Sequence, residues 1–221
     1  MSQVPVIAID GPSASGKGTV ASRVAGALGW HYLDSGALYR LVALAAREAG
    51  VGPEDEAGLT QIARRMRVEF AGDAVRLDGR EVGRELRSEE ISAAASRMAA
   101  LGAVRSALLD RQRAFRRPPG LVAEGRDMGS VVFPDARVKV FLTASARARA
   151  RRRHKQLIEK GLPANMAGLL QELRERDARD AARAHAPLRR CADAVLLDTT
   201  GKSIEEAVAF VLDLAQGYSH R

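Results

Sequence analysis

A glycine-rich segment, Gly11–Thr19, separates a short apolar run from an amphipathic one, and it constrains the fold more than any other part of the chain. The run before it, Val6–Asp10, is rich in β-branched and aliphatic residues, which predicts a strand. After it, small and apolar residues recur at helical spacing as far as Leu28, and Gly29 is placed to end the helix. The sequence therefore predicts a strand, a tight loop and a helix in succession, as in an α/β fold.

The loop itself reads GPSASGKGT and follows the pattern G-x-x-x-x-G-K. Glycines let such a loop curl so that successive backbone N–H groups face an anion, and the helix N-terminus adds partial positive charge. Lys17 is placed to reach the outer phosphates of a nucleotide. We therefore interpret the whole loop as the nucleotide-binding site, comprising Gly11, Pro12, Ser13, Ala14, Ser15, Gly16, Lys17, Gly18 and Thr19.

One position departs from the usual pattern. A Ser or Thr normally follows the lysine and offers its hydroxyl to Mg²⁺, whereas here Gly18 follows it and the hydroxyl comes one residue later, at Thr19. We therefore assign no protein ligand to the metal. Mg²⁺ is expected with the nucleotide, held mostly by phosphates and water.

The composition points to one soluble domain. With 221 residues, 46% of them hydrophobic, the chain can bury a full core and carry a modest insertion. No apolar run is long enough to span a bilayer, and the start of the chain does not resemble a secretory signal, so we expect a cytoplasmic protein. The lone cysteine, Cys191, cannot form an internal disulfide and is interpreted as a small, partly buried side chain.

The net charge of +8 raises the question of nucleic-acid binding. The chain has 30 arginines but only 5 lysines, and aromatic residues make up 4%, too few for an evident base-stacking surface. Arginine is suited to bidentate phosphate recognition. We therefore expect small phosphorylated ligands, with no nucleic-acid or membrane partner, and keep polynucleotide binding as an alternative.

Short apolar runs separated by helical segments predict a five-stranded parallel sheet flanked by helices. The candidate strands are Val6–Asp10, His31–Asp34, Leu121–Glu124, Val138–Thr143 and Ala194–Asp198. Between Arg67 and Gly83 two alternating runs flank Ala71-Gly72-Asp73, which predicts a small antiparallel hairpin.

Polar residues follow two of these strands, at the sheet edge where open α/β folds bind ligands. The first group is Asp34-Ser35-Gly36-Ala37-Leu38-Tyr39-Arg40, which supplies a hydroxyl and a guanidinium. The second is Glu124-Gly125-Arg126-Asp127-Met128-Gly129, in which Arg126 can clamp a phosphate and Asp127 can accept hydrogen bonds. A simple turn and a structural salt bridge are the respective alternatives.

Two arginine-rich segments follow. Arg176, Asp180 and Arg183 are spaced to share one helix face, which fits a ligand site or an exposed face of ion pairs. The run from Ala146 to about Gly161 predicts a helix whose densest basic cluster is Arg149, Arg151, Arg152 and Arg153. That cluster is either a solvated face or a lid that closes over transferring phosphates.

Taken together, these segments resemble one family. GPSASGKGT, DSGALYR, EGRDMGSVVFPDA and RERDARDAARAHAPL occur in the order and spacing of the bacterial cytidylate kinases, which are nucleoside monophosphate kinases. The resemblance covers the chain from Val6 to about Thr199. It implies a single P-loop NTPase-type domain over residues 1–221, with a monophosphate-binding insertion at about 60–100 and a lid at about 148–165.

The resemblance also implies roles for individual residues. Ser35, Arg40 and Arg126 match positions that contact the acceptor monophosphate, whereas Ser96, Arg105 and Asp127 match positions that read the cytosine edge. Arg176, Asp180 and Arg183 match the group around the acceptor sugar and phosphate. The residues expected to act in catalysis are Lys17, Arg126, Arg176 and Arg183.

The implied reaction is ATP-dependent phosphorylation of CMP and dCMP by a monomeric enzyme of pyrimidine metabolism, with Mg²⁺ as the ATP-bound cofactor. Two other classes compete with it: a sister kinase acting on UMP or AMP, and a P-loop switch or nucleic-acid-binding protein. Guanine-reading switch proteins use an Asn-Lys-x-Asp motif, and the only asparagine here is Asn165, in Asn-Met-Ala. The relative use of CMP, dCMP and UMP and the role of Glu124 stay open at this point.

Overall fold

A computed structural model of the chain describes residues 3–71, 74–159, 161 and 163–219. It divides into two compact units. The sheet unit comprises Met1–Leu33 and Phe115–Arg221, and the helical unit comprises Asp34–Ala114. Strand β2, His31–Asp34, ends where the helical unit begins.

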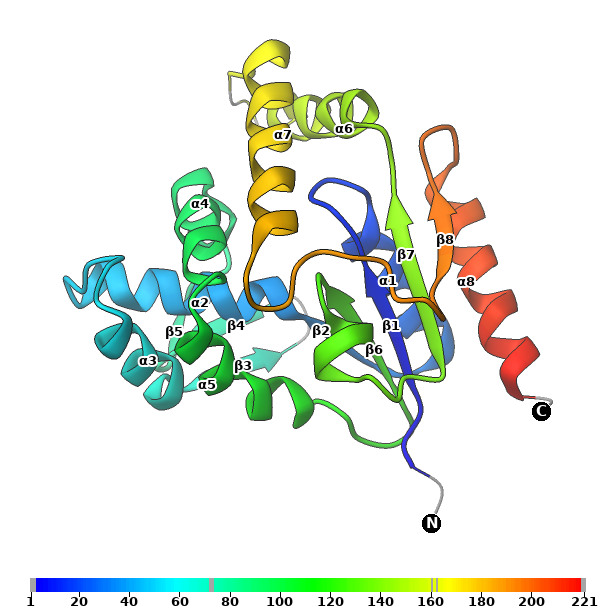
Figure 1. Ribbon diagram of the computed structural model, residues 1–221, viewed down its shortest axis with the longest axis horizontal. Coiled ribbons are helices and arrows are strands. Elements are labelled where there is room, and N and C mark those ends of the chain that lie inside the picture. The colour runs from blue at the N-terminus through cyan, green and yellow to red at the C-terminus, as the bar shows by residue number, and fades with distance from the viewer. Residues whose placement is uncertain (1–2, 72–73, 160, 162, 220–221) are drawn as a thin grey trace. The chain divides into compact units, whose positions relative to one another are not determined.

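A five-stranded sheet in the order β2-β6-β1-β7-β8 organises the sheet unit (Figure 1). The central strand β1 pairs in parallel with β6 and β7, and β7 pairs in parallel with β8. The strands besides β2 are β1 Val6–Asp10, β6 Leu121–Gly125, β7 Val138–Thr143 and β8 Val195–Asp198. The predicted strands are confirmed, with differences of one residue at the end of β6 and the start of β8.

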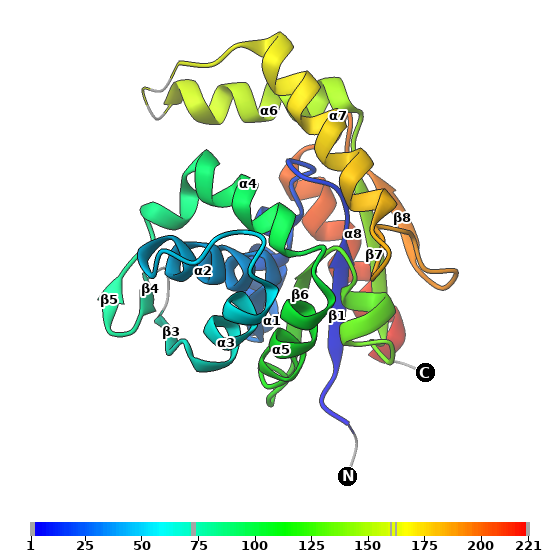
Figure 2. The same ribbon diagram turned by 60° about the vertical axis from the view of Figure 1, so that its left-hand side comes forward.

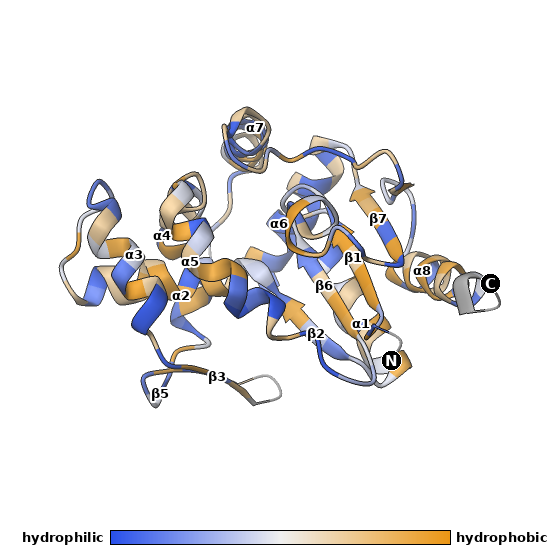
Figure 3. Ribbon diagram, turned by 60° about the horizontal axis from the view of Figure 1, so that its bottom comes forward, coloured by the Kyte–Doolittle hydropathy of each residue, from blue (hydrophilic) through white to orange (hydrophobic). Residues whose placement is uncertain are grey.

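The core of the sheet unit lies between the sheet and two helices, α1 (Lys17–Leu28) and α8 (Ile204–Ser219). Strand β1 is buried along its whole length, as expected for the central strand of a sheet covered on both faces. Figure 3 shows hydrophobic residues concentrated along β1 and β7. Helix α1 buries Val20, Val24 and small residues against this core, which confirms the predicted helical spacing.

Two further helices of the sheet unit, α6 (Ala146–Glu159) and α7 (Met166–Ala182), pack against each other (Figure 2). The predicted helix from Ala146 is confirmed. Leu162, part of the predicted break after it, lies outside the described residues. Asn165 caps α7 by accepting hydrogen bonds from the N–H groups of Ala167 and Gly168. A short π-helical turn, η2 (Met128–Val132), follows β6.

The helical unit packs its helices around buried aliphatic residues such as Leu38, Leu41 and Ile91. Its elements are α2 Ser35–Glu48, α3 Glu56–Arg65, β3 Val68–Ala71, β4 Ala74–Leu77, β5 Arg80–Glu81, η1 Glu85–Arg87, α4 Glu89–Met98 and α5 Gly102–Arg113. Strands β3 and β4 form the predicted antiparallel pair, and β5 adds a third strand that the sequence analysis did not predict. The predicted turn residues Gly72 and Asp73 lie outside the described residues.

Within the described ranges, no helix combines the length and apolarity that crossing a membrane requires.

Candidate active site

The glycine-rich loop joins the end of β1 to the start of α1, as predicted, and Gly11 and Gly16 are required there for two different reasons. A Cβ at Gly11 would lie 2.0 Å from the carbonyl oxygen of Leu142, so only glycine lets the loop pass β7 at this point. Gly16 caps α1 with φ 96°, a left-handed conformation that favours glycine. Ala14 also has a positive φ, of 57°, and alternating conformations of this kind turn backbone N–H groups toward a common centre.

The loop also holds a buried hydroxyl that suits an anion. Ser15 is 1% exposed, and its Oγ has no hydrogen-bond partner among the described residues. A buried hydroxyl without a partner is costly, so such groups mark positions where a ligand completes the hydrogen bonding. The loop therefore has the backbone shape, the helix N-terminus and the polar atom that a phosphate group requires.

Lys17, the first residue of α1, is held at the mouth of the loop by two oxygens. Its Nζ lies 3.5 Å from the carbonyl oxygen of Pro12 and 3.5 Å from Oε2 of Glu124. Glu124 belongs to β6, the strand beside β1, and its side chain is nearly buried. The carboxylate also faces the unusual glycine of the loop, because a Cβ at Gly18 would lie 3.3 Å from Glu124 Oε1.

Arg126 connects the loop to the end of α7. Its NH2 group donates to Ser13 Oγ at 2.8 Å, and its Nε donates to Asp180 Oδ2 at 2.8 Å. Asp180 is completely buried and also accepts a hydrogen bond from Arg183. Burial alone would raise the pKa of Asp180, but Arg126, Arg183 and Arg176 together hold that pKa below its ordinary value. Asp180 is therefore ionised and accepts hydrogen bonds from Arg126 and Arg183.

The predicted helical spacing of Arg176, Asp180 and Arg183 is wrong in one respect. Helix α7 ends at Ala182, and Arg183 has an extended conformation with ψ 132°. The chain has already left the helix at Arg183, and the N–H group of Leu188 turns back to donate to the carbonyl oxygen of Asp180. Arg183 consequently binds Asp180 from outside the helix. Asp180 and Arg183 are therefore neighbours, as predicted, but they do not share a helix face.

Two arginines of α6 hold the backbone of the loop. Arg149 is buried and donates to the carbonyl oxygen of Ser13 at 3.1 Å and to Asp177 of α7. Arg152 donates to the carbonyl oxygen of Ser15 at 2.8 Å and to Thr199. The sequence predicted either a solvated face or a lid for this cluster, and no role was assigned to Asp177 or Thr199. In this structure Arg149 and Arg152 stabilise the loop by binding its backbone carbonyl oxygens.

Four further predicted residues, Ser35, Arg40, Ser96 and Arg105, belong to the helical unit, whereas Asp127 lies in the sheet unit directly before η2. Arg40 donates to Asp34 Oδ2 at 2.6 Å, and Asp34 also caps α2, the helix that Ser35 begins. Arg105 of α5 donates to the carbonyl oxygen of Ala99 at 3.1 Å, and its guanidinium lies 5.9 Å from the centre of the Tyr39 ring. Ser96 is 5% exposed, and its Oγ has no hydrogen-bond partner within the part of the chain that the structure describes.

The comparison with protein families decides the classification. The model of the cytidylate kinase family matches residues 7–217, nearly the whole chain. The chain belongs to the cytidylate kinase family. The resemblance inferred from the sequence motifs is thereby confirmed.

Individual members of the cytidylate kinase family are similar over nearly their whole length. A cytidylate kinase of Bordetella pertussis is 60% identical over 209 residues, which are 95% of this chain and 94% of that protein. A cytidylate kinase of Chromobacterium violaceum is 60% identical over 210 residues, covering 95% of both chains. One of Nitrosomonas eutropha is 58% identical over 211 residues, covering 96% of this chain and 94% of that protein.

Solved structures show a more distant likeness. An uncharacterized protein from Eubacterium ventriosum, 12% identical, covers 97% of this chain and 99% of its own with a TM-score of 0.50. A gluconokinase from Sinorhizobium meliloti, 17% identical, covers 100% of this chain and 97% of its own with a TM-score of 0.49. At this identity the first comparison concerns the fold alone.

The cytidylate kinase motifs account for most of the geometry above, but three residues were missed. Asp10, Asp177 and Thr199 each bond to the loop, to its neighbouring turn or to an arginine that holds the loop. Asp10 and Thr199 stand at or just after the carboxyl ends of predicted strands, which was the available signal. Asp177 had none beyond lying in the same arginine-rich segment as Asp180.

Proposed function

We propose that this chain transfers the γ-phosphoryl group of ATP to CMP and dCMP, giving ADP with CDP or dCDP. The observation that carries the proposal is the match of residues 7–217 to the cytidylate kinase family, supported by relatives of that name at 60% identity. The loop between β1 and α1 supplies the expected donor site, with a lysine and a helix N-terminus at its mouth. The chain is therefore a phosphotransferase.

The chemistry needs alignment and charge neutralisation more than covalent help from the protein. A phosphate oxygen of CMP is already a competent nucleophile at neutral pH, so no side-chain base is required. The proposed catalytic residues are cationic for this reason: Lys17, Arg126, Arg176 and Arg183. Support comes from Arg126, which already bonds to both the donor loop and Asp180.

The proposed acceptor site uses Ser35, Arg40, Ser96, Arg105, Arg126, Asp127, Arg176, Asp180 and Arg183. Cytosine presents an amine, a ring nitrogen and a carbonyl, so its recognition needs both acceptors and donors. Asp127 is an acceptor, Arg105 a donor and Ser96 either. The buried Ser96 hydroxyl without a partner among the described residues supports this assignment, because a ligand would satisfy it.

The residues near Lys17 fit Mg²⁺, the expected cofactor. Mg²⁺ prefers oxygen ligands and usually keeps several waters beside the phosphates of its nucleotide. The Glu124 carboxylate lies against Gly18, the position at which related loops carry a metal-binding hydroxyl. We propose that Glu124 and the Thr19 hydroxyl hold the water shell of the ion. When bound, the ion neutralises charge on the transferring phosphates.

We propose that the monophosphate-binding insertion comprises about residues 60–100 and the lid about residues 148–165, within one kinase domain. Closure of these parts excludes water, which otherwise competes as acceptor. ATP and CMP or dCMP are the proposed partners, and the enzyme is proposed to act as a cytoplasmic monomer.

A coupled assay of ADP release with Mg-ATP tests the function. The acceptors to compare are CMP, dCMP, UMP, AMP, GMP and shikimate. We expect fast turnover with CMP and dCMP, weaker turnover with UMP and none above background with the others. Turnover with another acceptor would overturn the assignment of Ser96, Arg105 and Asp127 to cytosine recognition. The absence of acceptor-dependent turnover would overturn the proposal that the chain is a kinase.

A further inference from the structure

Asp10 is a buried acid outside every role assigned so far. Asp10 is the last residue of the central strand β1, directly before the loop, and it is 6% exposed. Its two carboxylate oxygens accept separate backbone hydrogen bonds, from the Met128 N–H group to Oδ1 at 2.8 Å and from the Gly129 N–H group to Oδ2 at 2.9 Å. Both N–H groups belong to the first turn of η2.

These two bonds fix the place where the chain leaves β6. Gly125 ends the strand beside Asp10, and only Arg126 and Asp127 separate it from the bonded N–H groups. Asp127 has φ −147° and ψ 24°, outside the regular helix and strand regions, so neighbouring elements must hold this turn in shape. Its carbonyl oxygen in turn accepts hydrogen bonds from Val131 and Val132. The segment that follows Asp127 is therefore anchored both to Asp10 and to the Asp127 carbonyl.

The turn packs closely against the Asp10 carboxylate. A Cβ at Gly129 would lie 3.2 Å from Cδ of Lys139 and 3.5 Å from Asp10 Oδ2, so the turn approaches both side chains closely. Only an ionised or acceptor-rich side chain can satisfy two N–H groups at once. Burial raises the pKa of Asp10 to about 6, and the Met128 and Gly129 hydrogen bonds partly oppose that rise. Burial therefore opposes ionisation of Asp10, whereas the two backbone hydrogen bonds favour the ionised form.

We propose that Asp10 is a positioning residue for acceptor binding: its carboxylate holds the turn that aims Arg126 and Asp127 at CMP. This rests on the proposed function, which assigns Arg126 to the phosphate of CMP and Asp127 to cytosine. Asp10 does not touch the substrate. It acts by preorganising two side chains that do, so that binding CMP does not have to order the turn.

The substitution Asp10→Asn tests the proposal. Asparagine has the same shape but offers one acceptor and one donor, so one of the two N–H groups meets an N–H group instead of an oxygen. We expect the KM for CMP to rise about tenfold or more, because a buried backbone donor loses its charged partner. We expect the KM for ATP to change less than about twofold. The control is Asp213→Asn, the same chemical change at an exposed site on α8 of the same unit, which should leave both KM values unchanged.

The outcomes separate this inference from the function it rests on. Equal rises in both KM values would indicate general damage and overturn the positioning role, as would a folded variant with an unchanged KM for CMP. Absent turnover with CMP in the unsubstituted enzyme would instead overturn the proposed function.

A measurement on the unsubstituted protein covers the case in which Asp10→Asn does not fold. In an NMR pH titration, the carboxyl carbon resonances of Asp10 and Asp127 are followed separately, which distinguishes the two neighbouring acids. Among the described residues, Arg126 and Cys191 also interact with Asp10, and Lys139 approaches the same turn. We expect the Met128 and Gly129 amide resonances and the Arg126 Nε–H resonance to follow the Asp10 midpoint. An Arg126 resonance that ignores that midpoint would overturn the proposal.

Discussion

At the scale of single residues, three of the arginines proposed to bind phosphate are each held by an acid. Asp180 holds Arg126 and Arg183 in the sheet unit, and Asp34 holds Arg40 in the helical unit. A guanidinium that is already directed loses less conformational entropy when an anion arrives. These pairs are half-buried or buried, where the attraction is screened less than at the surface. The acids thus prepare the arginines for a phosphate ligand.

Arg126 gives the sharpest test at this scale. Replacing it by alanine removes a cation from the proposed acceptor site and leaves the buried Asp180 with fewer partners. By analogy with other lost electrostatic stabilisers, we expect Arg126→Ala to lower kcat/KM for CMP by about 10²-fold or more. Steady-state kinetics with saturating Mg-ATP measures the effect.

Arg116 supplies a matched control in the same unit. It donates to the carbonyl oxygen of Val4 at 2.7 Å and to Asp135 at 2.7 Å. Neither partner is among the proposed catalytic or substrate-binding residues. Arg116→Ala should reduce thermal stability with kcat/KM for CMP kept within about threefold. Near-normal kinetics in Arg126→Ala would contradict the phosphate role of Arg126.

The sequence indicated which residues carry charge at the sheet edge, but it could not pair them. Arg126, Asp180 and Arg183 were recognised as candidates from strand ends and helical spacing. The bond between Arg126 and Ser13 joins positions 113 residues apart, and only the tertiary fold brings them together. Asp10 and Thr199 were missed for the same reason, since an acid or a threonine at the end of a strand has no distinctive local pattern.

At the scale of elements, boundaries were predictable where local chemistry marks them. Gly29 ends α1 in a left-handed conformation with φ 64°, as the sequence indicated. The end of α7 is marked less closely, because the residues around Arg183 are alanines, arginines and a histidine that a helix tolerates, and the helix breaker Pro187 comes only four residues later. The chain leaves the helix there because of tertiary contacts, including the hydrogen bond from Leu188 to Asp180.

The phosphate loop depends on elements far from it in sequence. Thr199, just after β8, places its Oγ1 3.1 Å from the Ser15 carbonyl oxygen and 3.0 Å from that of Thr143, and it accepts from Arg152. A hydroxyl has one proton, so it donates to one of these carbonyls at a time. Through Thr199, the ends of β7 and β8 and helix α6 all fix the loop backbone.

The substitution Thr199→Val tests this support. Valine keeps the shape of threonine and removes its hydrogen bonds, so the Ser15 carbonyl loses one partner and the loop loses part of its fixed form. We expect the KM for ATP to rise about three- to tenfold, with the KM for CMP little changed, on the scale of one buried hydrogen bond. Initial-rate kinetics with each substrate varied in turn provides both values.

Thr200→Val is the matched control for that prediction. Thr200 is the next residue and bonds through its hydroxyl to Asp198 and to the N–H group of Ser145 rather than to the loop. It should leave the KM for ATP unchanged. Equal effects of the two substitutions would refute a specific role of Thr199 in holding the loop.

At the scale of the whole molecule, the two compact units divide the proposed site residues. The helical unit carries Ser35, Arg40, Ser96 and Arg105, whereas the sheet unit carries the loop and the others. The predicted insertion at about 60–100 lies inside the helical unit, which starts earlier, at Asp34. A hairpin can be found from its alternating residues, but the extent of a compact unit depends on packing of α2 against α4 and of α3 against α5 that no local pattern shows.

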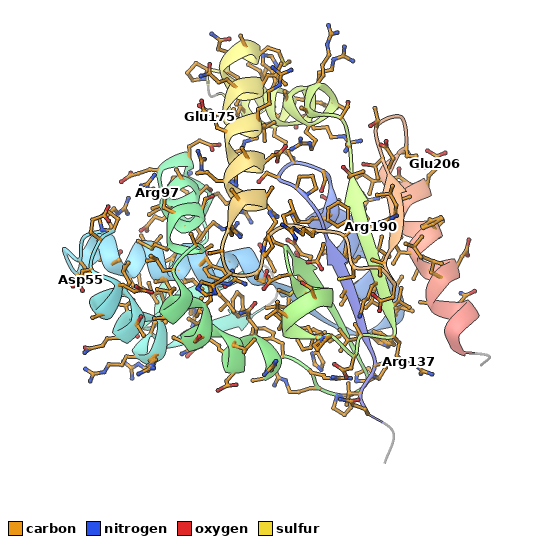
Figure 4. All side chains as sticks on the ribbon, viewed as in Figure 1. Asp55, Arg97, Arg137, Glu175, Arg190 and Glu206 are labelled. Atoms are coloured by element: carbon orange, nitrogen blue, oxygen red, sulfur yellow. The ribbon has the colours of Figure 1, made fainter. Side chains whose placement is uncertain are left out.

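The strongly basic composition also has a structural meaning at this scale. Several arginines are built into the fold, since Arg149 and Arg152 bond to loop carbonyls and Arg126 to Asp180. Others are on the surface together with acids: Figure 4 shows Arg137 and Arg190 as well as Glu175 on α7 and Glu206 on α8. The net charge of +8 therefore includes arginines that serve the proposed phosphate chemistry.

The most direct test of the central claim follows the phosphoryl group itself. The protein is incubated with CMP and Mg-ATP labelled in the γ-phosphate, and the products are separated. The account predicts that the label appears in CDP at the rate at which ADP forms, and that little labelled inorganic phosphate accumulates, because the closed site excludes water. Label released mainly as inorganic phosphate, or no transfer to CMP, would contradict it.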